Sequence, residues 1–115
     1  MNTKFDKALT NLHCAIVDDY IRWDGRSPGD HNPERVAEFS EGLSFEEGRK
    51  YVKVVKKMGR QSMVWGFVMK SDDKMFRAGD ILKAAGWSAP ARNRARGNIL
   101  DEDFSWVRWT GPEYL

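Results

Sequence analysis

The sequence has little of what most enzyme and metal sites are built from. Its 115 residues include one cysteine, Cys14, and two histidines, His13 and His31. A single cysteine excludes an internal disulfide and any site made of several cysteines, and it is typical of a reducing compartment. His13 and Cys14 are adjacent, so on a helix their side chains project about 100° apart. They cannot act together as a base and a nucleophile.

Catalytic motifs are also missing. The sequence contains no glycine-rich phosphate loop and no HExxH motif. The acidic pairs at residues 18–19 and 72–73 could bind a hard cation weakly, but adjacent carboxylates on a helix or turn are usually only solvated. We therefore expect a nonenzymatic protein with no catalytic residues, no metal and no cofactor.

Long apolar runs do not occur in the chain. A membrane-spanning helix needs roughly 18 consecutive apolar residues, and the first residues lack the apolar segment of a signal peptide. The hydrophobic content of 41% and charged content of 31% are ordinary for a globular protein. These values predict one compact domain, not bound to a membrane, in the cytoplasm.

Charge is unevenly distributed along the chain. Residues 1–48 contain five Lys or Arg and ten Asp or Glu, residues 49–98 contain thirteen and three, and residues 99–115 contain one and four. A basic block within a nearly neutral chain indicates a polyanionic partner, because a local field steers encounter. The alternative is that the acidic and basic blocks face each other within the fold or across a homodimer.

The first 48 residues have a helical pattern. Apolar residues recur at steps of three or four from Phe5 to Trp23, which predicts a helix over residues 3–23. Asn32 and Pro33 predict the start of a second, short helix that ends at Gly42. Ser44, followed three residues later by Glu47, repeats a helix-capping signature and predicts at most one further turn.

From residue 49 the hydrophobic period changes to two. The runs YVKVVKKM (51–58) and SMVWGFVMK (62–70) predict a β-hairpin, whose second strand is central because it is apolar on both faces. Asp80 then caps a helix over 81–85, Ser88 caps another that ends near Gly97, and residues 104–110 form a strand. The expected fold is α+β: N-terminal helices, a β-hairpin, a short helical pair and a closing C-terminal strand. We expect residues 1–48 to form an acidic helical region packed on a basic ββααβ module, residues 49–115.

The predicted helical pair resembles a helix-turn-helix. Its second helix carries Asn93, which could reach a base edge, and three arginines that could reach phosphates, as could Lys83 on the first helix. The register is imperfect, since Leu82 stands where such motifs favour a small residue and Arg92 occupies a usually buried position. Alternatively the arginines form a solvated face that pairs with residues 101–103. The arginines are Arg92, Arg94 and Arg96.

The hairpin offers a second basic surface. Basic residues interleaved with an aromatic ring, here Tyr51, suit single-stranded nucleic acid, because bases stack on rings while cations neutralise phosphates. Lysines that protect an exposed strand from aggregation are the competing interpretation. The candidate phosphate contacts are Lys53, Lys56, Lys57 and Arg60.

Tryptophan is abundant, with five residues in the chain. We expect Trp23 and Trp65 in the core, where a large ring contributes most buried area. Trp87, between the predicted helices, and Trp106 and Trp109, on opposite faces of the last strand, are candidates for contact with a protein partner.

The run RAGDILKAAGWSAPARNRARGNIL, with YVKVVKKM and VWGFV before it and VRWTGP after it, resembles a family of small, functionally uncharacterised proteins of tailed bacteriophages. The resemblance covers about residues 49–112, so residues 1–48 fall outside it. It implies a phage protein that acts in the bacterial cytoplasm, and it supplies no functional residues. The sequence thus supports two hypotheses: binding of DNA or RNA, or inhibition or adaptation of a host protein of transcription, nuclease or defence complexes.

Overall fold

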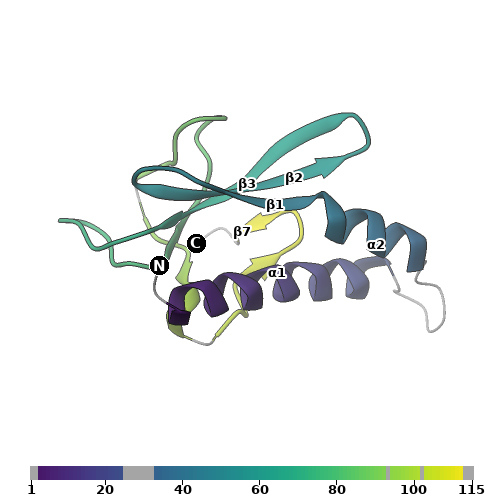
Figure 1. Cartoon of the computed structure of the whole chain (residues 1–115), viewed down its shortest axis with the longest axis horizontal. Coiled ribbons are helices and arrows are strands. Elements are labelled where there is room, and N and C mark those ends of the chain that lie inside the picture. Colours follow the sequence, from purple (N-terminus) through teal and green to yellow (C-terminus); the bar gives the residue numbers. More distant parts are fainter. Residues whose placement is uncertain (1–2, 25–32, 93, 102, 113–115) are drawn as a thin grey trace.

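A computed structural model describes residues 3–24, 33–92, 94–101 and 103–112 of the chain. It has an α+β fold, as predicted (Figure 1). The elements in chain order are α1 (Thr3–Asp24), α2 (Pro33–Gly42), β1 (Leu43–Glu47), β2 (Tyr51–Met58), β3 (Gln61–Met69), β4 (Asp80–Leu82), β5 (Gly97–Asn98), the 3-10 turn η1 (Ile99–Asp101), β6 (Val107–Arg108) and β7 (Gly111–Pro112). Both predicted N-terminal helices and the predicted hairpin are present.

The main sheet is antiparallel, with strand order β1-β2-β3-β4-β5. The predicted central position of β3 is confirmed, because two strands lie on each side of it. Gly59 forms the tight turn from β2 to β3 with a φ of 64°, a left-handed conformation that suits glycine. The β2–β3 hairpin extends past the rest of the sheet as an arm above α2 (Figure 1).

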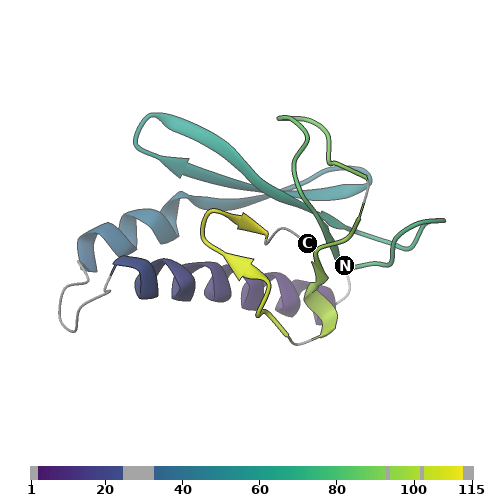
Figure 2. The same cartoon turned by 180° about the vertical axis from the view of Figure 1, so that it is seen from behind.

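One face of the sheet, here called the inner face, packs on α1. The helix lies along this face, and the β6–β7 hairpin lies between them (Figures 1 and 2). The periodic residues of α1 from Phe5 to Tyr20 are buried against Val52, Val54 and Trp65. The amphipathic pattern of α1 therefore builds the main core, as expected from its spacing.

The opposite face, here called the outer face, carries a smaller core. Phe67, Met69, Phe76 and Leu82 are buried together there. The cover is irregular chain, of which residues 83–92 and 94–96 are described. We call these residues the flap; they rise on the side of the sheet away from α1 (Figure 2). The strand β3 is thus apolar on both faces because both are covered, by a helix on one side and by the flap on the other.

The predicted helical pair is wrong. Residues 80–82 form β4, in which Ile81 pairs with Val68 and Leu82 with Phe67. Consecutive residues of a strand point to opposite faces, and Ile81 and Leu82 are fully buried in the inner and outer cores respectively. A helix could not bury both in this way, so strand pairing overrides the helix preference of the alanines.

The flap that follows β4 doubles back on itself instead of forming a second helix. Ala84 and Pro90 form an isolated antiparallel bridge, and the amide of Ala91 donates to the carbonyl of Lys83 at 2.7 Å. A residue before proline is disfavoured in the helical region, which helps keep this segment extended. The arginines expected on a second helix therefore lie on irregular chain.

Two smaller predictions are also wrong. The turn expected after Ser44 is the edge strand β1, in which Leu43 is buried and Ser44 exposed, as strand alternation requires. Trp23 is not a core residue, because 43% of it is exposed, whereas Trp65 is 2% exposed as predicted. The predicted final strand contains β6, which turns back to pair with β7.

Candidate nucleic-acid interface

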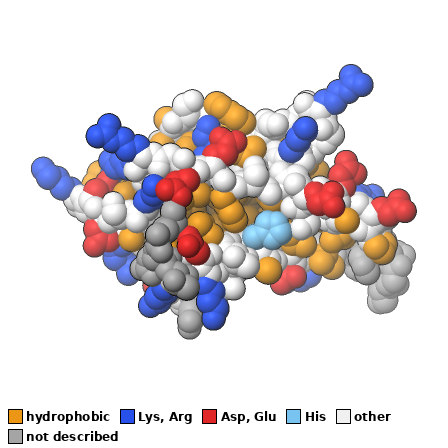
Figure 3. Space-filling model, viewed as in Figure 1, with side chains coloured by type: hydrophobic (Ala, Val, Ile, Leu, Met, Phe, Trp, Pro, Cys, Tyr) orange, Lys and Arg blue, Asp and Glu red, His pale blue; other side chains and the backbone are white. Residues whose placement is uncertain are grey.

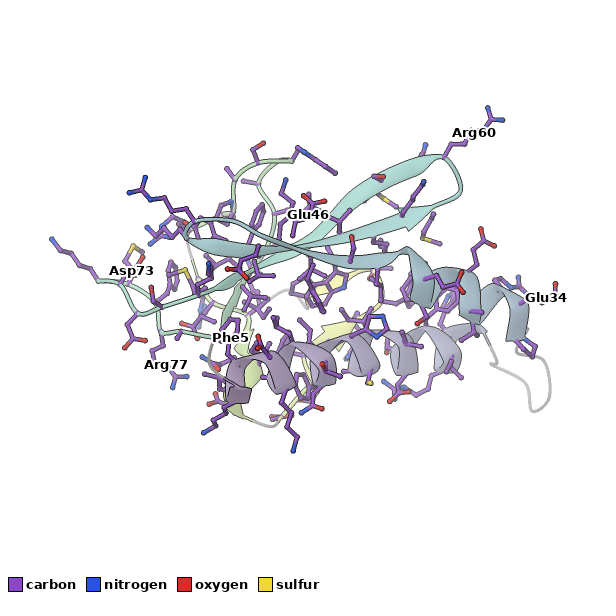
Figure 4. The ribbon with its side chains drawn as sticks, viewed as in Figure 1. Phe5, Glu34, Glu46, Arg60, Asp73 and Arg77 are labelled. Atoms are coloured by element: carbon purple, nitrogen blue, oxygen red, sulfur yellow. The ribbon has the colours of Figure 1, made fainter. Side chains whose placement is uncertain are left out.

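Four basic side chains lie on β2 and on the turns at its two ends. Lys53 and Lys57 project from β2 at alternate positions, Arg49 lies in the turn before β2, and Arg60, in the turn after it, points away from the hairpin tip (Figure 4). We call Arg49, Lys53, Lys57 and Arg60 the outer row. At about 3.3 Å per residue, Lys53 and Lys57 are roughly 13 Å apart along β2. None of its members forms an ion pair with a carboxylate of the described residues.

Lys56 lies on the opposite, inner face. It is 5% exposed, its ammonium donates to the carbonyl of Trp109 at 3.2 Å, and it lies 5.1 Å from that ring's centroid. Burial lowers the pKa of Lys56, because desolvation disfavours the charged form. The structure therefore removes Lys56 from the predicted phosphate contacts, since the period of two turns it away from solvent.

A groove lies where the β1–β2 turn faces the flap. Its volume is about 390 Å³, within the range of roughly 300–1,000 Å³ typical of ligand sites. Two members of the outer row, Arg49 and Lys53, line it. The other lining residues are Glu46, Glu47, Gly48, Lys50, Tyr51, Phe67 and Ser88. The groove therefore combines cations with aromatic rings.

Trp87 stands beside this groove on the flap. It is 50% exposed, and the ammonium of Lys53 lies 4.5 Å from the centroid of its ring. This distance is within the range of a cation–π contact, which holds Lys53 against one face of the indole. The contact connects the flap to the outer row.

Two carboxylates also line the groove. Glu47 accepts a hydrogen bond from Lys70 at 2.8 Å, so its charge is locally compensated. Glu46 is exposed and lies directly opposite Lys53 in the β1–β2 register. Glu46 reduces the positive potential around Lys53 because opposite charges on neighbouring strands compensate each other.

Arg92 has a structural partner that the sequence did not suggest. Its guanidinium donates to the Asp73 carboxylate and to the Tyr51 hydroxyl. Asp73 also accepts the backbone N–H groups of Met75 and Phe76 at 2.8 Å each. The Met75 backbone bond, followed by the Arg92 contact, lowers the pKa of the Asp73 carboxyl. Arg92 therefore ties the flap to the loop after β3, instead of pairing with residues 101–103.

The remaining predicted contacts are dispersed. Lys83 donates to the Pro112 carbonyl at 3.2 Å, and Arg96 donates through Nε to the Arg94 carbonyl at 3.3 Å. Arg94 is exposed on the flap, and Asn93 lies outside the described residues. The flap thus offers Arg94 as its most exposed described arginine, and most of its other basic groups are engaged by the fold.

The three tryptophans proposed for partner contact have different surroundings. Trp106 is half-buried and donates to the Asp103 carbonyl at 2.7 Å. Trp109 is half-buried beside Trp23, with ring centroids 4.8 Å apart. Trp87 differs from these two residues because it is exposed to solvent.

Sequence reasoning missed two basic residues of the groove, Arg49 and Lys50. Arg49 lies in the turn between β1 and β2, and it lines the groove because that turn faces the flap, which the sequence did not predict. Lys50 forms an ion pair with Asp73 at 3.4 Å. The contact between Lys53 and Trp87 had no sequence signal, because it depends on the unpredicted path of the flap.

The described residues lack a cluster of metal ligands and a membrane-spanning helix. No group of three His, Cys, Asp or Glu side chains in the described ranges is placed to hold a metal. The described helices include none long and apolar enough to cross a membrane. Figure 3 shows acidic side chains over α2 and also across the left half of this face, where they lie among basic side chains.

The chain belongs to a protein family of unknown function, DUF7717, which it matches over residues 2–114. The match includes the acidic helices as well as the basic module, so residues 1–48 are part of the region shared with the family. No curated protein and no solved structure matches the chain.

Proposed function

We propose that this DUF7717 protein binds nucleic acid without catalysing a reaction, through phosphate contacts made by the outer row. The observation that carries the proposal is the row itself: four cations on β2 and on the turns at its two ends, none in an ion pair with a described carboxylate. Such a row suits a polyanion, because each cation that contacts a phosphate releases counterions.

Carboxylates lie near both lysines of the outer row. Glu38 on α2 lines one pocket with Lys57, and Glu46 lies opposite Lys53. Each carboxylate lowers the positive potential around its neighbour. Neither forms an ion pair with a lysine of the outer row, so both lysines can contact phosphates.

The loss of the helical pair changes the proposed mode of binding. Without a recognition helix, phosphate contacts from a β-hairpin position the ligand but carry no sequence information. We therefore propose binding with little sequence preference. From the motif resemblance we further infer a phage protein acting in the cytoplasm of a bacterial host.

The test is a fluorescence polarization titration with labelled DNA and RNA at about 50 mM and 200 mM salt. We expect salt-sensitive binding, and we expect the triple variant Lys53→Gln/Lys57→Gln/Arg60→Gln to reduce the logarithmic salt slope by about 2 to 3. The matched control, Lys4→Gln/Lys7→Gln/Arg22→Gln on α1, removes the same charge and should retain the slope. Absence of wild-type binding at low salt would overturn the proposal.

A second candidate function is docking on a host protein. It is favoured by the pair Trp23 and Trp109, because Trp23 is 43% exposed while its ring packs on Trp109. Exposed aromatic rings are enriched at protein interfaces. A tagged pull-down from host lysate after nuclease treatment distinguishes the two functions: a stoichiometric protein that is lost with Trp23→Ala would favour docking.

A further inference from the structure

The flap holds the Trp87 ring at a fixed place above the outer face. The amides of Ala85 and Gly86 both donate to the carbonyl of Ala89, at 3.0 and 3.2 Å, which closes the turn that carries Trp87. At the base of the flap, Ala84 bridges to Pro90. The ring is therefore presented by a closed turn, which reduces the entropy lost when a ligand binds it.

Cations, aromatic rings and the carboxylates of Glu46 and Glu47 surround the Trp87 ring and the groove beside it. Lys53 covers one face of the indole at 4.5 Å, while half of the residue remains exposed to solvent. The adjacent groove is lined by Tyr51 and Phe67 as well as Arg49, and its volume is about 390 Å³. An exposed ring next to cations and a groove of this size is the combination that binds a flat base together with its phosphates.

We propose that the Trp87 site takes an unpaired base of single-stranded nucleic acid. The base stacks on the exposed surface of Trp87, and Lys53 and Arg49 contact the phosphates on either side. This inference rests on the proposed function, and it specifies that the nucleic acid bound at this site is single-stranded. A base inside a duplex is stacked between its neighbours and cannot stack on Trp87 unless it is unpaired, so the site selects single strands.

The exposed ring favours nucleic acid over an acidic peptide as the occupant. An acidic peptide would match the cations equally well, but it carries a flat ring only where it has an aromatic residue, whereas every nucleotide carries a base that can stack on Trp87. The stacking surface therefore decides between the two ligands.

The experiment compares a labelled twelve-residue oligothymidine with a duplex of twelve base pairs, by fluorescence polarization at low salt. Trp87→Ala should weaken binding of the single strand by roughly 5- to 150-fold, the range expected for loss of one base–aromatic stack, and leave the duplex affinity unchanged. Trp23→Ala removes an equally large, partly exposed ring outside the groove, and should leave both affinities unchanged.

A second readout separates stacking from structural damage. Unlabelled oligothymidine should quench part of the tryptophan fluorescence of the wild type. Trp87→Phe keeps a ring for stacking, so it should retain most of the affinity while losing that part of the quenching.

The outcomes distinguish this inference from the function on which it rests. Wild-type binding to both oligonucleotides, with the Trp87→Ala affinities unchanged, would overturn the base site and leave the phosphate row standing. Failure of the wild type to bind either oligonucleotide would overturn both. Equal losses for the single strand and the duplex in Trp87→Ala would also overturn the base site.

Discussion

Two adjacent lysines of β2 lie on opposite faces of the sheet and differ in their exposure to solvent. Lys56 is buried beneath the chain's last strands and donates to a backbone carbonyl, whereas its neighbour Lys57 is exposed on the outer side. The two residues have the same chemistry, so only their position on the strand distinguishes them. Parity along a strand therefore decides which basic residues stabilise the fold and which are available to a ligand.

The largest expected effect is the loss of stability on replacing Trp65, which is buried on the inner face, compared with replacing the exposed Lys57. Trp65 is 2% exposed on the inner face and donates to the Arg108 carbonyl at 2.8 Å. Trp65→Ala should lower the free energy of unfolding by about 3–5 kcal/mol, because it leaves a cavity. The exposed Lys57→Ala should change it by less than about 0.5 kcal/mol. Urea denaturation measures both, and similar losses in the two variants would contradict the contrast.

A smaller effect on stability is expected at Asp73, which joins the outer cover to the sheet. Asp73→Asn should lower the melting temperature at neutral pH, because the Arg92 contact loses its charge. The lowered pKa of Asp73 means that its contribution is complete above about pH 4 and is lost as the pH falls toward that lower value.

The melting temperatures of the wild type and Asp73→Asn should therefore converge as the solution is acidified. Thermal scans at several pH values measure this difference. Asp18→Asn, at an exposed position of α1, is the control. A difference in melting temperature that stays constant down to acidic pH would show that the charge of the Asp73 carboxylate does not cause the stabilisation.

The next prediction compares Lys56 and Lys57 by their effect on the salt dependence of nucleic-acid binding. Lys57→Met should reduce the logarithmic salt slope for nucleic acid by about 0.7 to 0.9, because one phosphate contact is lost. Lys56→Met should leave the slope unchanged, since this side chain is buried against Trp109. Polarization titrations at several salt concentrations measure both slopes. Equal reductions of the salt slope in Lys57→Met and Lys56→Met would show that both lysines contact the ligand, which contradicts the structural role assigned to Lys56.

The smallest effect is expected at Glu46, the carboxylate opposite Lys53. Glu46→Gln should strengthen binding of single-stranded DNA by about 1.5- to 5-fold, because an exposed opposite charge near the phosphates is removed. Glu41→Gln makes the same change on α2 and should have little influence. The same titration checks both variants, and weaker binding of Glu46→Gln would indicate that this carboxylate contacts the ligand.

Elements with a sustained hydrophobic period were predictable from the sequence. The helix α1 repeats its apolar face from Phe5 to Tyr20, over about four turns, and the strands β2 and β3 are long enough for alternation to define two faces. The outer positions of Lys53 and Lys57 follow from this alternation alone. Local sequence is sufficient here because every residue of the pattern supports the same structure.

Shorter elements were not predictable, because contacts distant in sequence decide them. The strand β4 has three residues, too few to display a period, and its pairing with β3 overrides the helix preference of the alanines that follow. The capping signature at Ser44 competed with the alternation of Leu43 and Phe45, and pairing with β2 selected the strand. The flap, and with it the place of Trp87, depends on this non-local pairing.

The β6–β7 hairpin, which lies between α1 and the sheet, is also joined to α1 by a hydrogen bond. The carboxylate of Asp19 accepts the backbone N–H of Trp109 at 2.8 Å, and the two residues are 90 positions apart. The helix α1 also packs on β6, so residues far apart in the sequence complete its apolar face. Contacts of such large sequence separation form slowly, because a long stretch of chain must close first. We therefore expect the docking of the β6–β7 hairpin on α1 to slow folding.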